Sequence, residues 1–124
     1  MLFEHLKFGK FREIEDRIVE GIINEGVEIC LPHFKQMEEA FLEKYRGPYA
    51  LFVNRRNAYS HSLEVLQHAN SYTNAVATAI ITYSPISHMS AKVHELHPGN
   101  IRTFHDFEKE HALNWLRLEL AKYL

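Results

Sequence analysis

Two short apolar runs constrain this chain more than any other feature. Tyr49–Val53 is apolar at nearly every position, and Ala75–Tyr83 is rich in β-branched residues and nearly free of charge. Continuous runs of this length are typical of strands covered on both faces, as in a parallel sheet with helices packed on it. We therefore expect Tyr49–Val53 and the core of the second run, Ala75–Ile81, to be adjacent, parallel and central.

The segments between and after these runs carry helix signals. Pro32 suits a first helical turn, and Gly47-Pro48 ends that helix. Further helices are expected over about 62–69, over about 85–97 with Ser84 as its N-cap, and after a cap at Asp106. The apolar positions at helical spacing are Phe34, Met37, Phe41, Leu42 and Tyr45 in the first helix; Ile86, Met89, Val93 and Leu96 in the third; and Phe107, Leu113, Leu116, Leu120 and Tyr123 in the last.

The N-terminal part predicts an antiparallel hairpin. Phe11–Ile14 and Ile18–Ile23 are the two strands, with Gly21 marking a bulge or a close backbone approach, and 1–10 is left unassigned. Ile101–Phe104 is a short final strand. The predicted order β-β-α-β-α-β-α-β-α indicates a single α/β domain over residues 1–124, with a mostly parallel sheet and one N-terminal antiparallel hairpin.

Composition excludes several classes of protein. The net charge of −2 gives no electrostatic case for nucleic-acid binding, and the apolar runs are far too short to span a bilayer. The N-terminal residues carry no signal-peptide pattern. Cys30 is the single cysteine, which fits a reducing compartment. We expect a cytoplasmic protein with no transmembrane segment.

A polar loop follows the first apolar run, and it is the strongest candidate for a binding site. The carboxyl end of a central strand is where open α/β sheets bind ligands, and arginine offers a planar fork of donors to carboxylate or phosphate groups. The loop residues that we expect to bind a ligand or a partner are Asn54, Arg55, Arg56, Asn57, Tyr59 and Ser60. The alternative is a structural loop in which one arginine pairs with a carboxylate such as Glu25.

The sequence gives little support to catalysis, metal binding or a cofactor. His94 and His97 are one helical turn apart, but no cysteine partner or His-Glu-x-x-His motif accompanies the nine histidines. Cys30 is expected to be a small core residue, since nothing around it indicates a helix N-terminus. Ser60, His61 and Ser62 lack the Gly-x-Ser-x-Gly elbow, and no glycine-rich nucleotide motif is present. We expect a protein that is not an enzyme and has no metal and no cofactor.

Four segments resemble the SpoIIAA-like group of STAS-fold proteins, also described as STAS/SEC14-like. Val53–Ser60 looks like the Asn-Arg-x-Asn-x-Tyr-Ser signature of a small bacterial branch of that group. The other three are the strand and turn at 23–27, the strand end at Tyr83-Ser84, and the ending Phe104–Leu116 with its Ala-x-x-Trp-Leu pattern. The resemblance implies a STAS/SpoIIAA-like fold and a non-enzymatic module.

The resemblance also suggests a phosphorylation site. Anti-sigma-factor antagonists of this fold carry a phosphorylated serine where Ser60 and Ser62 stand here, although the Asp and Gly of their pattern are replaced. The alternative is that Ser62 only caps a helix. Two functions follow as hypotheses: a regulatory or protein-interaction module acting through the loop, or a carrier of a small lipophilic or anionic ligand in a pocket beside it. The sequence leaves open whether the protein forms a homodimer.

Overall fold

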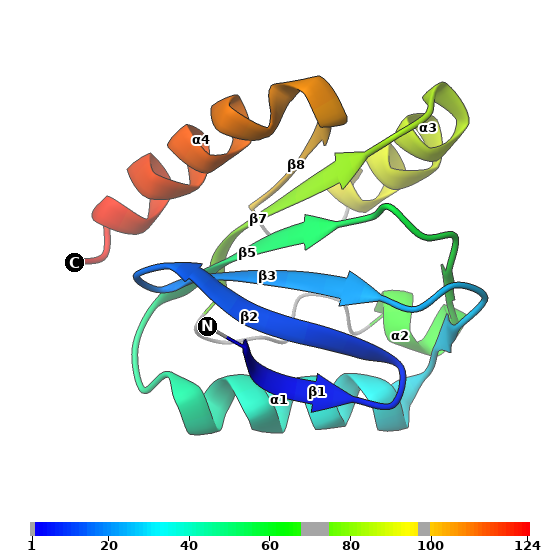
Figure 1. Cartoon of the computed structure of the whole chain (residues 1–124), viewed down its shortest axis with the longest axis horizontal. Helices are drawn as coiled ribbons and strands as arrows, with labels where there is room; N and C mark the ends of the chain where they lie inside the picture. Colours follow the sequence, from blue (N-terminus) through cyan, green and yellow to red (C-terminus); the bar gives the residue numbers. More distant parts are fainter. Residues whose placement is uncertain (1, 68–74, 97–99) are drawn as a thin grey trace.

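The computed structural model describes residues 2–67, 75–96 and 100–124 (Figure 1). The expected alternation of strands and helices is present, with extra short strands. The elements are β1 (Leu2–Leu6), β2 (Gly9–Glu15), β3 (Ile18–Ile23), β4 (Glu28–Ile29), α1 (Leu31–Lys44), β5 (Tyr49–Asn54), β6 (Ser60–His61), α2 (Leu63–Gln67), β7 (Ala75–Thr82), α3 (Pro85–Lys92), β8 (Ile101–His105) and α4 (Lys109–Ala121), with 3₁₀ turns η1 (Val93–Leu96) and η2 (Asp106–Glu108).

The main sheet has the strand order β1-β2-β3-β5-β7-β8. From β3 to β8 all neighbours are parallel, and β5 and β7 lie side by side, with Leu51 opposite Thr78 and Val53 opposite Ile80. The predicted central pair of parallel strands is therefore confirmed. The helices that connect parallel strands pack on the faces of the sheet, so the central strands are buried on both faces. This burial explains why these two strands are almost wholly apolar.

Helices cover the two faces of the sheet as separate layers (Figure 1). On one face, Phe34 and Phe41 of α1 and Val65 of α2 pack with Leu51 of β5. On the other face, Leu116 of α4 packs with side chains of the central strands that include Phe52 and Ile81. Alternate side chains of a strand point to opposite faces, so each central strand contributes to both clusters.

The N-terminal strands differ from the predicted single hairpin. β2 and β3 are antiparallel as expected, but β1 adds a second antiparallel pairing on the outer side of β2. Gly21 is a site of close approach rather than a bulge, because a Cβ there would lie 2.9 Å from a ring carbon of Phe11. The irregularity of the β2/β3 ladder lies instead between Glu13 and Glu15.

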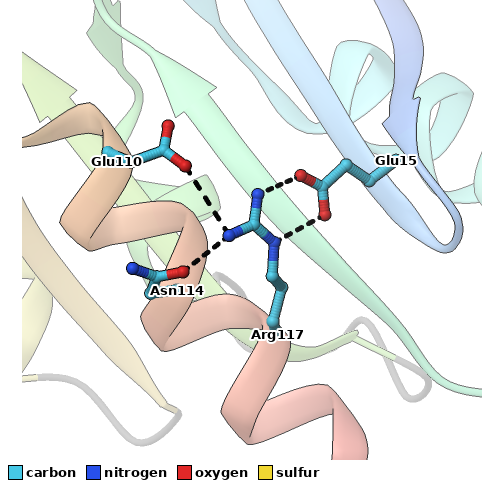
Figure 2. A network of polar contacts seen from close by, with 4 residues as sticks. All are labelled: Glu15, Glu110, Asn114 and Arg117. Atoms are coloured by element: carbon cyan, nitrogen blue, oxygen red, sulfur yellow. Dashed lines mark hydrogen bonds and ion pairs between the residues drawn. The ribbon is translucent and has the colours of Figure 1, made fainter.

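The last helix is tied to the N-terminal hairpin by a polar network (Figure 2). The guanidinium of Arg117 in α4 donates to both carboxylate oxygens of Glu15 in β2, with Nε 2.8 Å from Oε2. The same group donates to Asn114 Oδ1 and lies 3.7 Å from a carboxylate oxygen of Glu110. Arg117, near the end of the chain, thereby joins α4 to β2 in the N-terminal part.

Two expected apolar stripes are only partly buried. In α3, Ile86 and Met89 are 82% and 72% exposed, because this short helix turns its small residue Ala91 toward the sheet. In the last helix Leu116 and Leu120 are buried, whereas Phe107 is 80% exposed and Tyr123 also faces solvent. Asp106 is the first residue of η2 and does not act as the expected cap, a position that His105 occupies.

Candidate functional site

The loop after β5 begins with a residue that belongs to the scaffold. Asn54 donates from Nδ2 to Glu20 Oε2 over 3.1 Å, and it accepts from the Tyr83 hydroxyl over 2.7 Å. The other oxygen of the buried Glu20 carboxylate accepts from Arg12 Nε over 2.8 Å. This network joins the middle of β3 to the carboxyl end of β5 and to the residue that follows β7, and so holds the start of the loop.

Further hydrogen bonds hold the loop against the turn that follows β3. Asn57 donates from Nδ2 to Ile23 O over 2.9 Å, and the Ala58 amide donates to a carboxylate oxygen of Glu25 over 2.6 Å. Ala58 O in turn accepts from the Gly26 amide over 2.7 Å. Gly26 has a φ of +78°, which glycine adopts without the steric cost that a side chain would add. Glu25 therefore braces the loop through a backbone amide, not through an arginine.

The two serines that the resemblance singles out occupy different environments. Ser60 is exposed in β6, which pairs in parallel with β4. Ser62 is half-buried, and its hydroxyl accepts from the Val65 amide over 3.2 Å at the start of α2. The expected capping role of Ser62 is confirmed, and phosphorylation of either serine stays a prediction.

A cavity of about 190 Å³ lies between the sheet and the layer of α1 and α2. Its walls are mainly apolar side chains from both layers, and it is partly open to solvent. The apolar wall residues include Ile23, Phe34, Phe41, Leu51, Val53, Val65 and Ile80. Densely packed protein interiors contain few voids larger than a water molecule, so a space of this size is a binding-site candidate.

One part of the cavity wall is polar and contains Arg55, Tyr59, His61 and His94. The Arg55 guanidinium lies 4.7 Å from the centre of the Tyr59 ring and donates to Tyr59 O over 3.0 Å. The ring of His61 lies 5.5 Å from that of Tyr59 and 5.1 Å from that of His94, centre to centre. These contacts bring the loop, β6 and η1 to the same side of the cavity.

Burial sets the charge of this polar wall. It raises the pKa of the Tyr59 hydroxyl, so the phenol is protonated at neutral pH. Burial lowers the pKa of His61 to about 4, with smaller contributions from His94 and Arg55, so His61 is neutral there. Arg55 is thus a permanent positive charge beside two neutral groups.

Comparison with known proteins supports the fold. No family model matches the sequence. No curated protein matches it. Among solved structures, an uncharacterised DUF3478 family protein with a SpoIIAA-like fold, from Shewanella loihica PV-4, matches with a TM-score of 0.57 at 18% identity. The match covers 87% of this chain and 91% of that chain. The fold is SpoIIAA-like. The expected SpoIIAA-like α/β fold is therefore confirmed.

Within this SpoIIAA-like fold, the residues expected to bind a ligand or a partner separate into three groups. Arg55 and Tyr59 line the cavity. Asn54 and Asn57 hold the loop by the hydrogen bonds described above. Arg56 and Ser60 are exposed.

His61 and His94 are cavity residues that the sequence analysis did not identify. The sequence analysis considered His94 only with His97, as a possible metal ligand, whereas it lies in η1 beside the cavity. His61 follows Ser60 in β6, a strand too short to give a periodic signal. The one available signal was its place two residues after Tyr59, since alternation puts both side chains on the same side of an extended segment.

The expectation for Cys30 is corrected. Cys30 is half-buried and occupies the N-cap position of α1, with Sγ 3.5 Å from His33 Nδ1. The sequence analysis placed Pro32 in the first turn of this helix but did not recognise Cys30 as the N-cap, because cysteine is not a common N-cap residue.

Within 2–67, 75–96 and 100–124, no group of three or more histidine, cysteine or acidic residues is arranged to hold a metal ion. His97, the suggested partner of His94, lies outside these residues. No helix in the same part of the chain is long and apolar enough to cross a bilayer.

Proposed function

We propose that this protein is a non-catalytic binding module that holds a small lipophilic ligand between its sheet and α1, beside the loop that follows β5. The observation that carries this proposal is the apolar cavity of about 190 Å³ with Arg55 and Tyr59 in its wall. Apolar cavities of about 150 Å³ in other proteins stay dry and bind benzene. A cavity of this size therefore suits an aromatic ring or a short alkyl chain.

The chemistry of the cavity wall favours binding over catalysis. The described wall residues include no carboxylate, thiol or lysine amine, so the two histidines have no such group in the wall to act with as nucleophile or as acid–base partner. The low pKa of His61 leaves it mainly unprotonated at neutral pH. We therefore assign the wall a role in recognition.

A protein-interaction role for the same loop is the second candidate. Arg56, Ala58 and Ser60 are exposed, and neighbouring hydrogen bonds hold their backbone in one conformation. A preformed exposed loop loses little conformational entropy on binding a partner. In this form of the proposal, a ligand in the cavity would contact Arg55 and Tyr59 and so influence the adjacent exposed residues.

Native mass spectrometry of the purified protein tests the cavity proposal. Val53 lines the cavity and Val93 is exposed on η1, so Val53→Phe fills the cavity and Val93→Phe is the matched surface control. We expect a bound small molecule, or uptake of added benzene, in the wild type and in Val93→Phe but not in Val53→Phe. Thr78→Leu, at another position of the cavity wall, is the alternative cavity-filling variant if Val53→Phe does not fold.

Two results would reject the proposal. One is a wild-type protein that carries no ligand and takes up no benzene. The other is unchanged uptake in both cavity-filling variants. If a protein partner is captured instead and lost on Arg56→Glu, the loop-surface function is favoured.

A further inference from the structure

The position of Arg55 in the wall is fixed by the backbone and by Tyr59. Its amide donates to Ile81 O over 2.9 Å, which extends the β5/β7 ladder by one residue. Its side chain lies on Tyr59 and makes one hydrogen bond, from Nη2 to Tyr59 O over 3.0 Å. The guanidinium carries five N–H donors, so most of its donors remain for another acceptor.

The charge of Arg55 is not balanced by any carboxylate in the described part of the chain. The ion pairs between described residues involve Arg12, Lys92, Arg117 and Lys122, and the described cavity wall contains no aspartate or glutamate. A half-buried cation beside an apolar cavity loses hydration, and that cost is recovered only when an anion or polar acceptor replaces the water. The arrangement favours a ligand that brings its own negative charge.

The size and charge of the cavity limit the class of ligand further. The Arg55 guanidinium, beside neutral Tyr59 and His61, offsets one negative charge, and a doubly charged phosphate group would bring twice that charge into a mainly apolar space. A planar carboxylate also matches the fork of donors on a guanidinium. The cavity of about 190 Å³ has room for about six to eight carbon atoms, by comparison with cavities that hold benzene.

We propose that the ligand is a small monocarboxylate, with its carboxylate on the free donors of Arg55 and its apolar body among the side chains of the sheet and α1. This inference rests on the proposed function and adds the chemical class of the ligand to it. Medium-chain fatty acids and arylalkanoic acids of similar size are the members of that class that fit the cavity.

Isothermal titration calorimetry with octanoate and its neutral analogue octanamide tests the inference. The two probes have the same apolar chain and differ in charge, so the ratio of their Kd values isolates the contribution of the carboxylate. The variants are Arg55→Gln, Arg55→Lys and, as a control, Arg46→Gln, which removes an exposed arginine after α1. We expect the wild type and Arg46→Gln to bind octanoate at least tenfold more tightly than octanamide, as is typical of a hydrogen bond to a charged group.

Loss of the arginine should remove this preference. We expect a ratio near one in Arg55→Gln and an intermediate ratio in Arg55→Lys, which keeps the charge but loses the fork. Because each ratio compares two ligands on one protein, a moderate loss of stability does not change its meaning. If Arg55→Gln does not fold, the octanamide-to-octanoate Kd ratios of the wild type and of Arg55→Lys still test the inference.

The outcomes separate the two proposals. Equal binding of octanoate and octanamide to the wild type overturns the monocarboxylate inference and leaves the cavity as a lipophilic site. A tenfold preference that persists in Arg55→Gln also overturns it, because the carboxylate is then held elsewhere. Binding of neither probe overturns the inference, and absence of benzene uptake as well overturns the proposed function.

Discussion

Neighbouring polar residues at the end of β5 have different roles because their side chains have different partners. Asn54 is buried, and both ends of its amide are hydrogen-bonded, to Glu20 and to Tyr83. Arg55 lines the cavity and has unused donors. The two residues are adjacent in the sequence, so the sequence alone does not distinguish their roles. The structural role of Asn54 and the proposed binding role of Arg55 follow from the partners that surround each side chain.

Asn54→Ala should therefore lower stability without altering the ligand preference. The substitution leaves a Glu20 oxygen and the Tyr83 hydroxyl without their partner, at a cost of about 1–3 kcal/mol in the free energy of unfolding. Urea denaturation measures the loss. Arg56→Ala, at an exposed neighbour, is the control and should change stability by no more than about 0.5 kcal/mol. Equal stabilities of Asn54→Ala and wild type would mean that the network does not form in solution.

A second residue-scale prediction concerns Tyr45, whose buried hydroxyl donates to Glu13 Oε2. Tyr45→Phe should lower the free energy of unfolding by about 1.5–3 kcal/mol at pH 7, as expected for a hydrogen bond to a carboxylate. This bond is the main cause that lowers the pKa of Glu13 below its ordinary value of 4.5. The carboxylate's contribution to stability is therefore full above pH 4.5 and is lost as the pH falls through the lowered pKa of the folded state.

The pH dependence distinguishes this bond from simple packing. Unfolding should be followed by urea titration at pH 7 and at several values below 4.5, and the difference between Tyr45→Phe and wild type should narrow as the pH falls. Tyr123→Phe, at an exposed tyrosine, is the control and should match the wild type throughout. A difference that is constant with pH would assign the loss to packing of the ring.

At the scale of elements, helices α3 and α4 show how far periodicity predicts burial. Both carry apolar residues at helical spacing, but only α4 crosses the central strands and buries Leu116 and Leu120. Helix α3 is shorter and leaves Ile86 and Met89 exposed. Periodicity predicts that one face of a helix is apolar, and the position of the helix over the sheet decides whether that face is covered.

Helix α4 offers a matched test of its packing. Leu116→Ala should lower the free energy of unfolding by about 2–5 kcal/mol, because it removes a fully buried side chain between α4 and the sheet. Leu118→Ala, two residues along the same helix, removes an exposed leucine and should change stability by no more than about 0.5 kcal/mol. Similar losses in both variants, measured by urea denaturation, would show that α4 does not dock in the described orientation.

At the scale of the whole molecule, the sequence predicts the architecture better than it predicts the site. Central strands such as β5 and β7 are recognisable because burial on both faces demands continuous apolar residues. Strand β1 was missed because an edge strand does not impose such a pattern, and β4 and β6 were missed because they are too short to show one.

The cavity could not be predicted for a different reason. Its wall combines residues of the sheet, α1, α2, β6 and η1 that are distant in sequence, and the space depends on how far the helices stand from the sheet. The sequence analysis predicted Arg55 and Tyr59 as binding residues of the loop. A ligand pocket beside that loop was one of its two hypotheses for the function. His61 and His94 became part of the site only when the fold placed them beside Arg55.

The most direct test of the central claim is to locate a bound ligand by nuclear Overhauser effects. The protein is labelled with ¹³C at its methyl groups, and benzene or octanoate is added. We expect contacts from the ligand to the methyl groups of Leu51, Val53 and Val65, which line the cavity. Contacts confined to Ile86 and Met89 on the exposed face of α3, or no contacts to any methyl group, would contradict a ligand site inside the fold.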